Sequence, residues 1–146
     1  MFKNKILSQL RIAIGRDAPD FSWTENGQEL RLSTLKDGLN YLLIFYSTEC
    51  SHCLKEVPEV FEYLKDKTNT KVIAFAMETS ENTWLNYQLK MPGWHHVLGL
   101  NKWENTIART YQVNSTPSYF VLGMDKQIIS IPKKIADLKL VLKELN

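Results

Sequence analysis

The fold is decided by the stretch YLLIFYSTECSHC at residues 41–53. Its first six residues are apolar or aromatic without a break, which predicts a strand that is buried on both faces. Residues 51–67 carry apolar side chains at helical spacing, and residues 71–76 form a second apolar run. Because a strand, a helix and a strand follow one another, we expect a right-handed crossover between two parallel strands.

The rest of the chain continues the alternation of strands and helices. We expect a hairpin around the turn signal Asn26-Gly27, and a strand at 113–122 that is entered through a proline. The remaining expected elements are a helix at 80–91 capped by Ser80, a strand at 94–98, a helix at 103–111, a strand at 127–131 and a helix at 135–145. The predicted fold is α/β, with a lead-in helix at residues 1–14 and one domain at residues 15–146.

The composition excludes several classes of protein. A chain of 146 residues, 44% of them hydrophobic, can bury one core without disulfide staples. Eighteen basic and sixteen acidic side chains leave a net charge of +2 with no basic run, so we expect no nucleic-acid partner. The two cysteines are too few for a disulfide framework. No stretch approaches the ~20 apolar residues of a membrane helix.

The first residues do not form an export signal. Lys3 and Lys5 resemble the basic start of a signal peptide. The polar side chains of Ser8, Gln9 and Arg11 then interrupt the apolar core that such a peptide needs. We therefore expect an amphipathic lead-in helix, a cytoplasmic location if Met1 is the native start, and otherwise a chain whose leader is absent.

The two cysteines, Cys50 and Cys53, stand at the start of the helix expected after the first buried strand. Unpaired backbone N–H groups and the positive end of the helix dipole stabilise an anion there, so we expect Cys50 to be a thiolate of lowered pKa. Cys53 follows one turn later on the same helix face, within disulfide reach. The predicted reaction is thiol–disulfide exchange, in which Cys50 attacks a substrate disulfide and Cys53 resolves the mixed disulfide.

These residues, with others in a fixed order, resemble the TlpA/ResA group of thioredoxin-fold oxidoreductases. The resemblance covers residues 15–146 and rests on four motifs: GRDAPDF at 15–21, FYSTECSHC at 45–53, Pro58, and the pair Thr116-Pro117. It implies a thioredoxin-like fold, in which a central mixed sheet flanked by helices carries an N-terminal hairpin and a central insertion. That insertion corresponds to the segment between Thr79 and Lys102.

The resemblance also implies what the site binds and where the protein acts. A cis peptide bond before Pro117 would bring backbone groups of Thr116 beside Cys50, where an extended client strand pairs with them. The implied activity is reduction of protein disulfides in the periplasm, as part of cell redox homeostasis, with an upstream thiol donor that restores the dithiol. It calls for no cofactor and no metal, and we expect a monomer.

Glu56 is the candidate for proton transfer. It follows Cys53 by three residues and so faces the same helical turn, where the TlpA/ResA pattern has a glutamate that manages protons. Many thioredoxins place a buried acid six residues before the first cysteine, but Ile44 occupies that position here. The competing interpretation is a solvated Glu56 paired with a lysine.

His52 and Glu49 are candidates for tuning the Cys50 thiolate in opposite directions. A histidine directly before the second cysteine resembles the oxidising DsbA-type site, and a donating imidazole would stabilise the thiolate. The carboxylate of Glu49 would raise the thiol pKa instead. These opposed effects leave the redox direction open, and a solvent-facing His52 would tune nothing.

Three other interpretations remain. Copper would suit a thiolate and imidazole site, whereas structural zinc lacks its four ligands, and the neighbouring His95 and His96 point to opposite sides of a strand. A peroxiredoxin shares the APDF opening, but places threonine where Ser47 stands. The third interpretation is a redox-inert interaction module, which would have the fold without the disulfide-exchange activity. Separately, Trp94, His95, His96 and Trp103 form a candidate partner surface.

Overall fold

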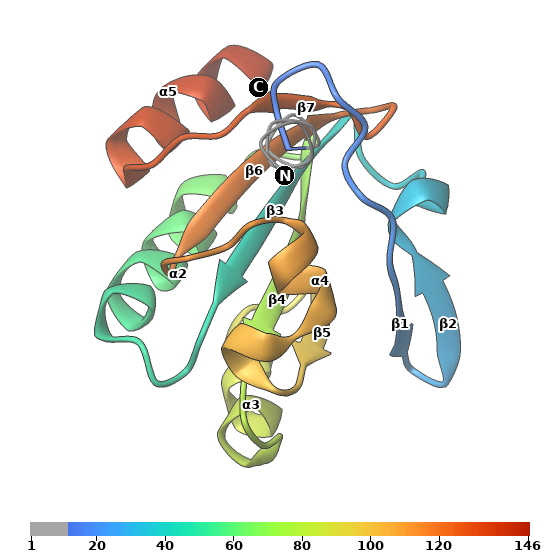
Figure 1. Cartoon of the computed structure of the whole chain (residues 1–146). Coiled ribbons are helices and arrows are strands. Elements are labelled where there is room, and N and C mark those ends of the chain that lie inside the picture. The colour runs from blue at the N-terminus through green and yellow to red at the C-terminus, as the bar shows by residue number, and fades with distance from the viewer. Residues whose placement is uncertain (1–11) are drawn as a thin grey trace.

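A five-stranded mixed sheet forms the centre of the computed structural model, which describes residues 12–146 (Figure 1). The strand order is β5-β4-β3-β6-β7, and β1 and β2 form a separate hairpin. The strands are β1 (Ser22–Glu25), β2 (Gln28–Arg31), β3 (Asn40–Tyr46), β4 (Thr70–Met77), β5 (His95–Gly99), β6 (Ser118–Gly123) and β7 (Ile128–Ser130). The α-helices are α2 (Ser51–Leu64), α3 (Asn82–Tyr87), α4 (Thr106–Thr110) and α5 (Ile135–Leu145), and short 3-10 turns are η1 (Leu32–Thr34), η2 (Gln88–Lys90) and η3 (Lys102–Glu104).

The expected parallel crossover is present at the centre of the sheet. β3 pairs in parallel with β4, which pairs in parallel with β5, whereas β6 is antiparallel to both β3 and β7. The register sets Tyr46 opposite Ala76, so β3 and β4 end side by side. Two parallel strands that end together bring the loops after them to one edge of the sheet, which is where sites form in α/β proteins.

Strand β3 is buried on both faces, as its unbroken apolar run predicts. Successive side chains point to opposite faces of a strand, so the run supplies two separate cores. Tyr41, Leu43 and Phe45 pack with the hairpin and the region of α4, while Leu42, Ile44 and Tyr46 pack with α2 and α5. Figure 1 shows the same division, with α2 and α5 on one side of the sheet and the hairpin and α4 on the other.

The hairpin and the last helix match their predictions. Asn26 and Gly27 both have positive φ, at 52° and 78°, which is the geometry that a two-residue hairpin turn favours. The closing helix has the predicted bounds. Both ends of β4 and both ends of β5 differ from the predicted ranges by one residue. Local sequence patterns are strongest where an apolar run ends at a turn residue.

Three helix predictions are wrong in extent, and the first, expected at 51–67, ends at Leu64. The helix expected at 80–91 is α3 continued by η2, and its cap is Glu81 without a side-chain hydrogen bond, not Ser80. The backbone N–H of Glu78 still bonds to β5, which delays the start of the helix. The helix expected at 103–111 is divided into η3 and α4, because the Asn105 side chain accepts the N–H groups of the next helix.

The predicted lead-in helix at 1–14 falls outside the described residues, except at 12–14, which form bends and a turn instead of a helix. Across residues 12–146, no helix has the length and apolar character needed to cross a membrane.

Candidate active site

Cys50 caps the N-terminus of α2, after the short loop that follows β3. Its backbone is extended, and its Sγ accepts the backbone N–H of Cys53 at 3.2 Å. A residue in this position satisfies one of the N–H groups that the first helical turn leaves unpaired. The sulfur therefore lies at the positive end of the helix, where a thiolate is stabilised.

The pKa of Cys50 is lowered by the groups around its sulfur. Partial burial opposes ionisation, but the Cys53 thiol, the Thr116 side chain and the backbone N–H groups of Cys53 and His52 outweigh it. Each of these hydrogen bonds favours the charged form of the thiol. Cys50 is therefore the more reactive of the two cysteines.

Cys53 lies one turn along α2 and is almost fully buried, with 1% of its surface exposed. Burial, together with the neighbouring Cys50, raises the pKa of its thiol to about 12. A backbone hydrogen bond from Ser47 acts in the opposite direction and lowers it. Both cysteines are free thiols in this structure. The pair thus combines a stabilised thiolate with a protonated, protected thiol.

The loop before β6 lies against the sulfur of Cys50. The Thr116–Pro117 peptide bond is cis, as the resemblance implies, and the Cys50 thiol donates to the Thr116 carbonyl oxygen at 3.5 Å. These residues are 66 positions apart in the sequence. The structure therefore brings together the cysteine and the proline loop that the sequence analysis placed in one site.

Glu56 takes part in a contact that the sequence did not indicate. Its carboxylate accepts a hydrogen bond at 2.8 Å from the hydroxyl of Tyr119 on β6. Burial, and then the hydrogen bond to Glu56, raise the pKa of Tyr119, so this hydroxyl remains a donor. No hydrogen bond within residues 12–146 joins Glu56 directly to Cys53. The carboxylate is thus held between α2 and β6, one helical turn from the buried thiol.

His52 and Glu49 both lie at the rim of the site. The side chain of His52 is exposed, and it is the backbone N–H of His52 that lowers the pKa of Cys50. Glu49 forms an ion pair with Lys102, at 3.6 Å between Oε1 and Nζ, and 58% of its side chain is exposed. The two side chains whose opposed effects were expected therefore both lie at the solvent-exposed rim.

A buried carboxylate, Glu78, is a site residue that sequence reasoning missed. It follows β4 directly, has 2% of its surface exposed and accepts hydrogen bonds from Ser47 and Thr48 in the loop before Cys50. The only signal in the sequence is an acidic residue at the carboxyl end of a buried parallel strand, where α/β proteins place their sites.

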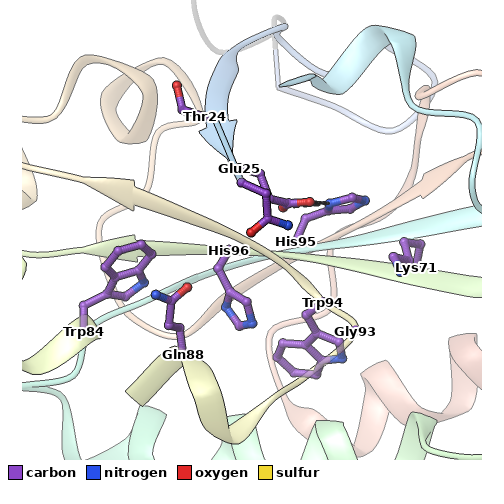
Figure 2. Close-up of a pocket in the computed structure, with 10 residues that line it drawn as sticks. Thr24, Glu25, Lys71, Trp84, Gln88, Gly93, Trp94, His95 and His96 are labelled. Atoms are coloured by element: carbon purple, nitrogen blue, oxygen red, sulfur yellow. Dashed lines mark hydrogen bonds and ion pairs between the residues drawn. The ribbon is translucent and has the colours of Figure 1, made fainter. Parts of the chain in front are cut away.

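The candidate partner surface at 94–96 and 103 does not form one patch. Figure 2 shows His95 and His96 on opposite sides of β5, with His95 pointing to Glu25. Trp94 packs edge-on against Phe61 of α2, with 5.6 Å between the ring centroids, and the Nε2 of His96 bonds to the backbone carbonyl of Met91, directly after η2. Of the four side chains, only Trp103 is exposed, at 45%.

Beside β5 lies a cavity of about 490 Å³, between the hairpin turn and α3 (Figure 2). Its walls include Trp84, Trp94 and His96, but neither cysteine. Across residues 12–146, no group of three or more His, Cys, Asp or Glu side chains is placed to hold a metal ion.

Comparisons with known proteins agree with this geometry. Residues 39–128 match a family model described as thioredoxin-like. The thiol-disulfide oxidoreductase ResA of Bacillus cereus is 30% identical over 127 residues, covering 82% of this chain and 69% of the relative. ResA of Bacillus anthracis is 30% identical over 126 residues with the same coverage.

Two solved structures share the fold. One is the thioredoxin domain of a thiol-disulfide oxidoreductase from Bacteroides vulgatus, with a TM-score of 0.76, 21% identity, and coverage of 92% of this chain and 99% of that one. The other is a thiol-disulfide oxidoreductase from Bacteroides fragilis, with a TM-score of 0.74, 20% identity, and coverage of 90% and 100%.

Proposed function

The chain belongs to the thioredoxin-like family and is a thiol–disulfide oxidoreductase, and from that premise we propose that Cys50 and Cys53 exchange with a disulfide in a client protein. One observation carries the assignment: Cys50 caps α2 with a lowered pKa, whereas Cys53, one turn on and buried, has a raised one. One thiol is therefore reactive toward a client, and the other is withheld until a mixed disulfide exists.

The first step is attack by the Cys50 thiolate on the client disulfide. A bond forms between Cys50 Sγ and one client sulfur, the client S–S bond breaks, and the other client sulfur leaves as a thiolate that takes up a proton. The Thr116 carbonyl oxygen beside Cys50 supports a role for Thr116 and Pro117 in pairing with an extended client strand.

The second step resolves the mixed disulfide. Cys53 gives its proton to the carboxylate of Glu56, and the resulting thiolate attacks Cys50 Sγ. The Cys50–Cys53 disulfide forms, and the client leaves with its second cysteine reduced. The position of Glu56 one turn beyond Cys53, where its carboxylate is held by the Tyr119 hydroxyl, supports this assignment.

The proposed direction is reduction of the client, with an upstream thiol donor that restores the two thiols. We place this activity outside the cytoplasm, in the periplasm, as part of the redox homeostasis of that compartment. The ResA relatives, which are named as thiol-disulfide oxidoreductases, support disulfide exchange as the chemistry of this step. A titration against glutathione tests the direction: a reductant has a potential below about −230 mV, whereas a value near about −120 mV would mark an oxidant.

The pairing of roles is tested by trapping a client. Reduced Cys53→Ser protein is incubated with periplasmic and cytosolic extracts, and adducts that dithiothreitol releases are identified by mass spectrometry. We expect specific adducts from the periplasmic extract and none on the matched Cys50→Ser variant. Equal adducts on both variants, or none on either, would contradict the proposed function.

A further inference from the structure

The carboxylate of Glu78 is buried beneath the loop that leads to Cys50. It accepts the Ser47 hydroxyl at 3.1 Å and the Thr48 backbone N–H at 3.0 Å, and it also accepts the Thr48 hydroxyl. All three residues are buried, with 2% of Ser47, 8% of Thr48 and 2% of Glu78 exposed. Three donors from two neighbouring residues thus converge on one buried carboxylate.

The sheet register brings Glu78 to this loop. β3 and β4 run parallel with Tyr46 opposite Ala76, so Thr48, two residues beyond Tyr46, lies at the level of Glu78. The backbone of Glu78 is also fastened, because its N–H donates to Gly99 at 2.9 Å and its carbonyl accepts the N–H of Lys102 at 3.2 Å. The carboxylate is therefore a fixed point against which the active-site loop is held.

Ser47 connects this fixed point to both cysteines. Its hydroxyl oxygen accepts the Glu49 N–H at 3.1 Å, and its carbonyl accepts the Cys50 N–H at 3.2 Å. Its own backbone makes the hydrogen bond that lowers the pKa of the Cys53 thiol. A change in the position of Ser47 would thus alter the donor that stabilises a Cys53 thiolate.

We propose that Glu78 is a positioning residue for the resolving step, because it holds Ser47, whose carbonyl accepts the Cys50 N–H and whose backbone N–H faces the Cys53 sulfur. The proposal rests on the proposed function, in which Cys53 must become a thiolate to attack Cys50. Glu78 itself transfers no proton: the proton of Cys53 goes to Glu56, the Cys53–Cys50 bond forms, and the client sulfur leaves with the electron pair.

The other titratable groups around Cys53 do not compete for this role. Tyr46 on β3, Tyr87 on α3 and Tyr119 on β6 face it from three elements, and Cys50 faces it from its own helix. Burial raises the pKa of each tyrosine. They remain uncharged at neutral pH, so a change in the Cys53 thiolate reports on Cys50, on the proton acceptor Glu56 and on the loop donor.

The disulfide reagent 5,5′-dithiobis(2-nitrobenzoic acid) separates the two steps. Attack by Cys50 releases one coloured thiolate, at a rate that depends on reagent concentration. Attack by Cys53 on the mixed disulfide releases the second, at a rate that does not. With one equivalent of reagent, the wild-type protein should release both, and Cys53→Ser only the first. A wild-type protein that releases no second thiolate would contradict the proposed function itself.

The informative variants are Glu78→Gln and Ser47→Ala. Glutamine keeps the size of the side chain and one acceptor oxygen, and alanine at position 47 keeps the backbone N–H but removes the hydroxyl that Glu78 holds. Loss of a hydrogen bond to a charged group should slow the second release by about tenfold in each variant and leave the first within about threefold. The pH profile of the second release should move to higher pH.

The matched control is Glu62→Gln, which makes the same chemical change at an exposed position of α2. It should leave both releases unchanged. The proposal is overturned if Glu78→Gln and Ser47→Ala resolve the mixed disulfide within about twofold of wild type, or if both releases fall equally with the melting temperature. If Glu78→Gln does not fold, Ser47→Ala decides the outcome alone.

Discussion

The acidic groups at the two ends of the parallel strands β3, β4 and β5 have different kinds of partner. Toward the starts of the strands, His95 bonds Glu25 through Nδ1 at 3.0 Å and Asp37 through Nε2 at 2.7 Å, and Lys71 lies 3.9 Å from Asp37. Figure 2 shows the His95–Glu25 contact, which joins β5 to the hairpin.

At the carboxyl ends of the same strands, beneath the exposed rim where Glu49 pairs with Lys102, the anionic groups meet dipoles in place of cations. Cys50 lies among N–H groups and Thr116, and Glu78 is held by hydroxyl and amide donors. A charge paired with a charge fastens one segment to another, whereas a sulfur held by dipoles can gain or lose its charge during a reaction. One end of the sheet thus contributes stability and the other contributes chemistry.

The largest expected effect comes from a substitution that removes the reactive thiol at the carboxyl ends of the strands and leaves the starts of the strands unchanged. Cys50→Ser should slow the first release from the disulfide reagent by at least about a thousandfold, because a serine hydroxyl is not ionised at neutral pH. The free energy of unfolding should stay close to wild type. The comparison would fail if Cys53 in this variant attacked the reagent at a rate near that of wild-type Cys50.

The second prediction compares the two thiols by pH. Only the thiolate is alkylated, so each rate rises with pH up to the pKa of its thiol and then levels off. Cys50, with its lowered pKa, should therefore react with iodoacetamide at pH 8 at least about a hundredfold faster than Cys53, whose pKa is about 12. Peptide mass spectrometry measures both rates. Equal labelling of the two cysteines would show that their environments do not differ.

The third prediction addresses the opposite end of the sheet. His95→Gln should lower the free energy of unfolding by about 1–3 kcal/mol, because Glu25 and Asp37 lose a shared, nearly buried partner. Urea unfolding measures this loss, and the first release from the disulfide reagent should stay within about twofold of wild type. Lys71→Gln is the control and should cost less than about 0.5 kcal/mol, since its ion pair is long and partly exposed. If His95→Gln slowed the first release and left the free energy of unfolding unchanged, the starts of the strands would contribute to the chemistry and the comparison would be wrong.

The smallest expected effect lies at the rim of the site. Lys102→Gln removes the cation from Glu49, and the unpaired carboxylate should then raise the pKa of Cys50. Because the pair is exposed, the alkylation midpoint should move up by only roughly 0.2–0.5 pH units. Lys65→Gln, at an exposed position after α2, is the control and should not move it. An unchanged midpoint would mean that Glu49 does not act on the sulfur.

Much of the fold follows from local patterns. The apolar run at 41–46 and the Asn26-Gly27 turn predict their elements because burial on two faces and positive φ are properties of a few neighbouring residues. The helices after β4 were harder to delimit. Their boundaries depend on where the chain is still bonded to β5, as at Glu78, and on the cap at Asn105.

The active-site residues divide in the same way. The position of Cys50 and Cys53 at a helix start is a local property, and the sequence alone indicated their unequal chemistry. The contact of Glu56 with Tyr119 joins α2 to β6, and that of Glu78 with Ser47 joins two loops 31 residues apart. No spacing in the sequence predicts either contact, because the strand order and register decide which side chains meet.

By itself, the sequence determined the strand–helix–strand unit, the cysteine pair at the helix start and the proline loop expected near it, because each rests on short-range periodicity or on a motif. The tertiary structure alone decided that Glu78 lies beneath the loop to Cys50 and that Tyr119 holds the carboxylate of Glu56. It also decided that His95 is buried where it fastens the hairpin, whereas Trp103 is exposed. Those outcomes depend on parallel register and burial, which arise only when distant segments pack together.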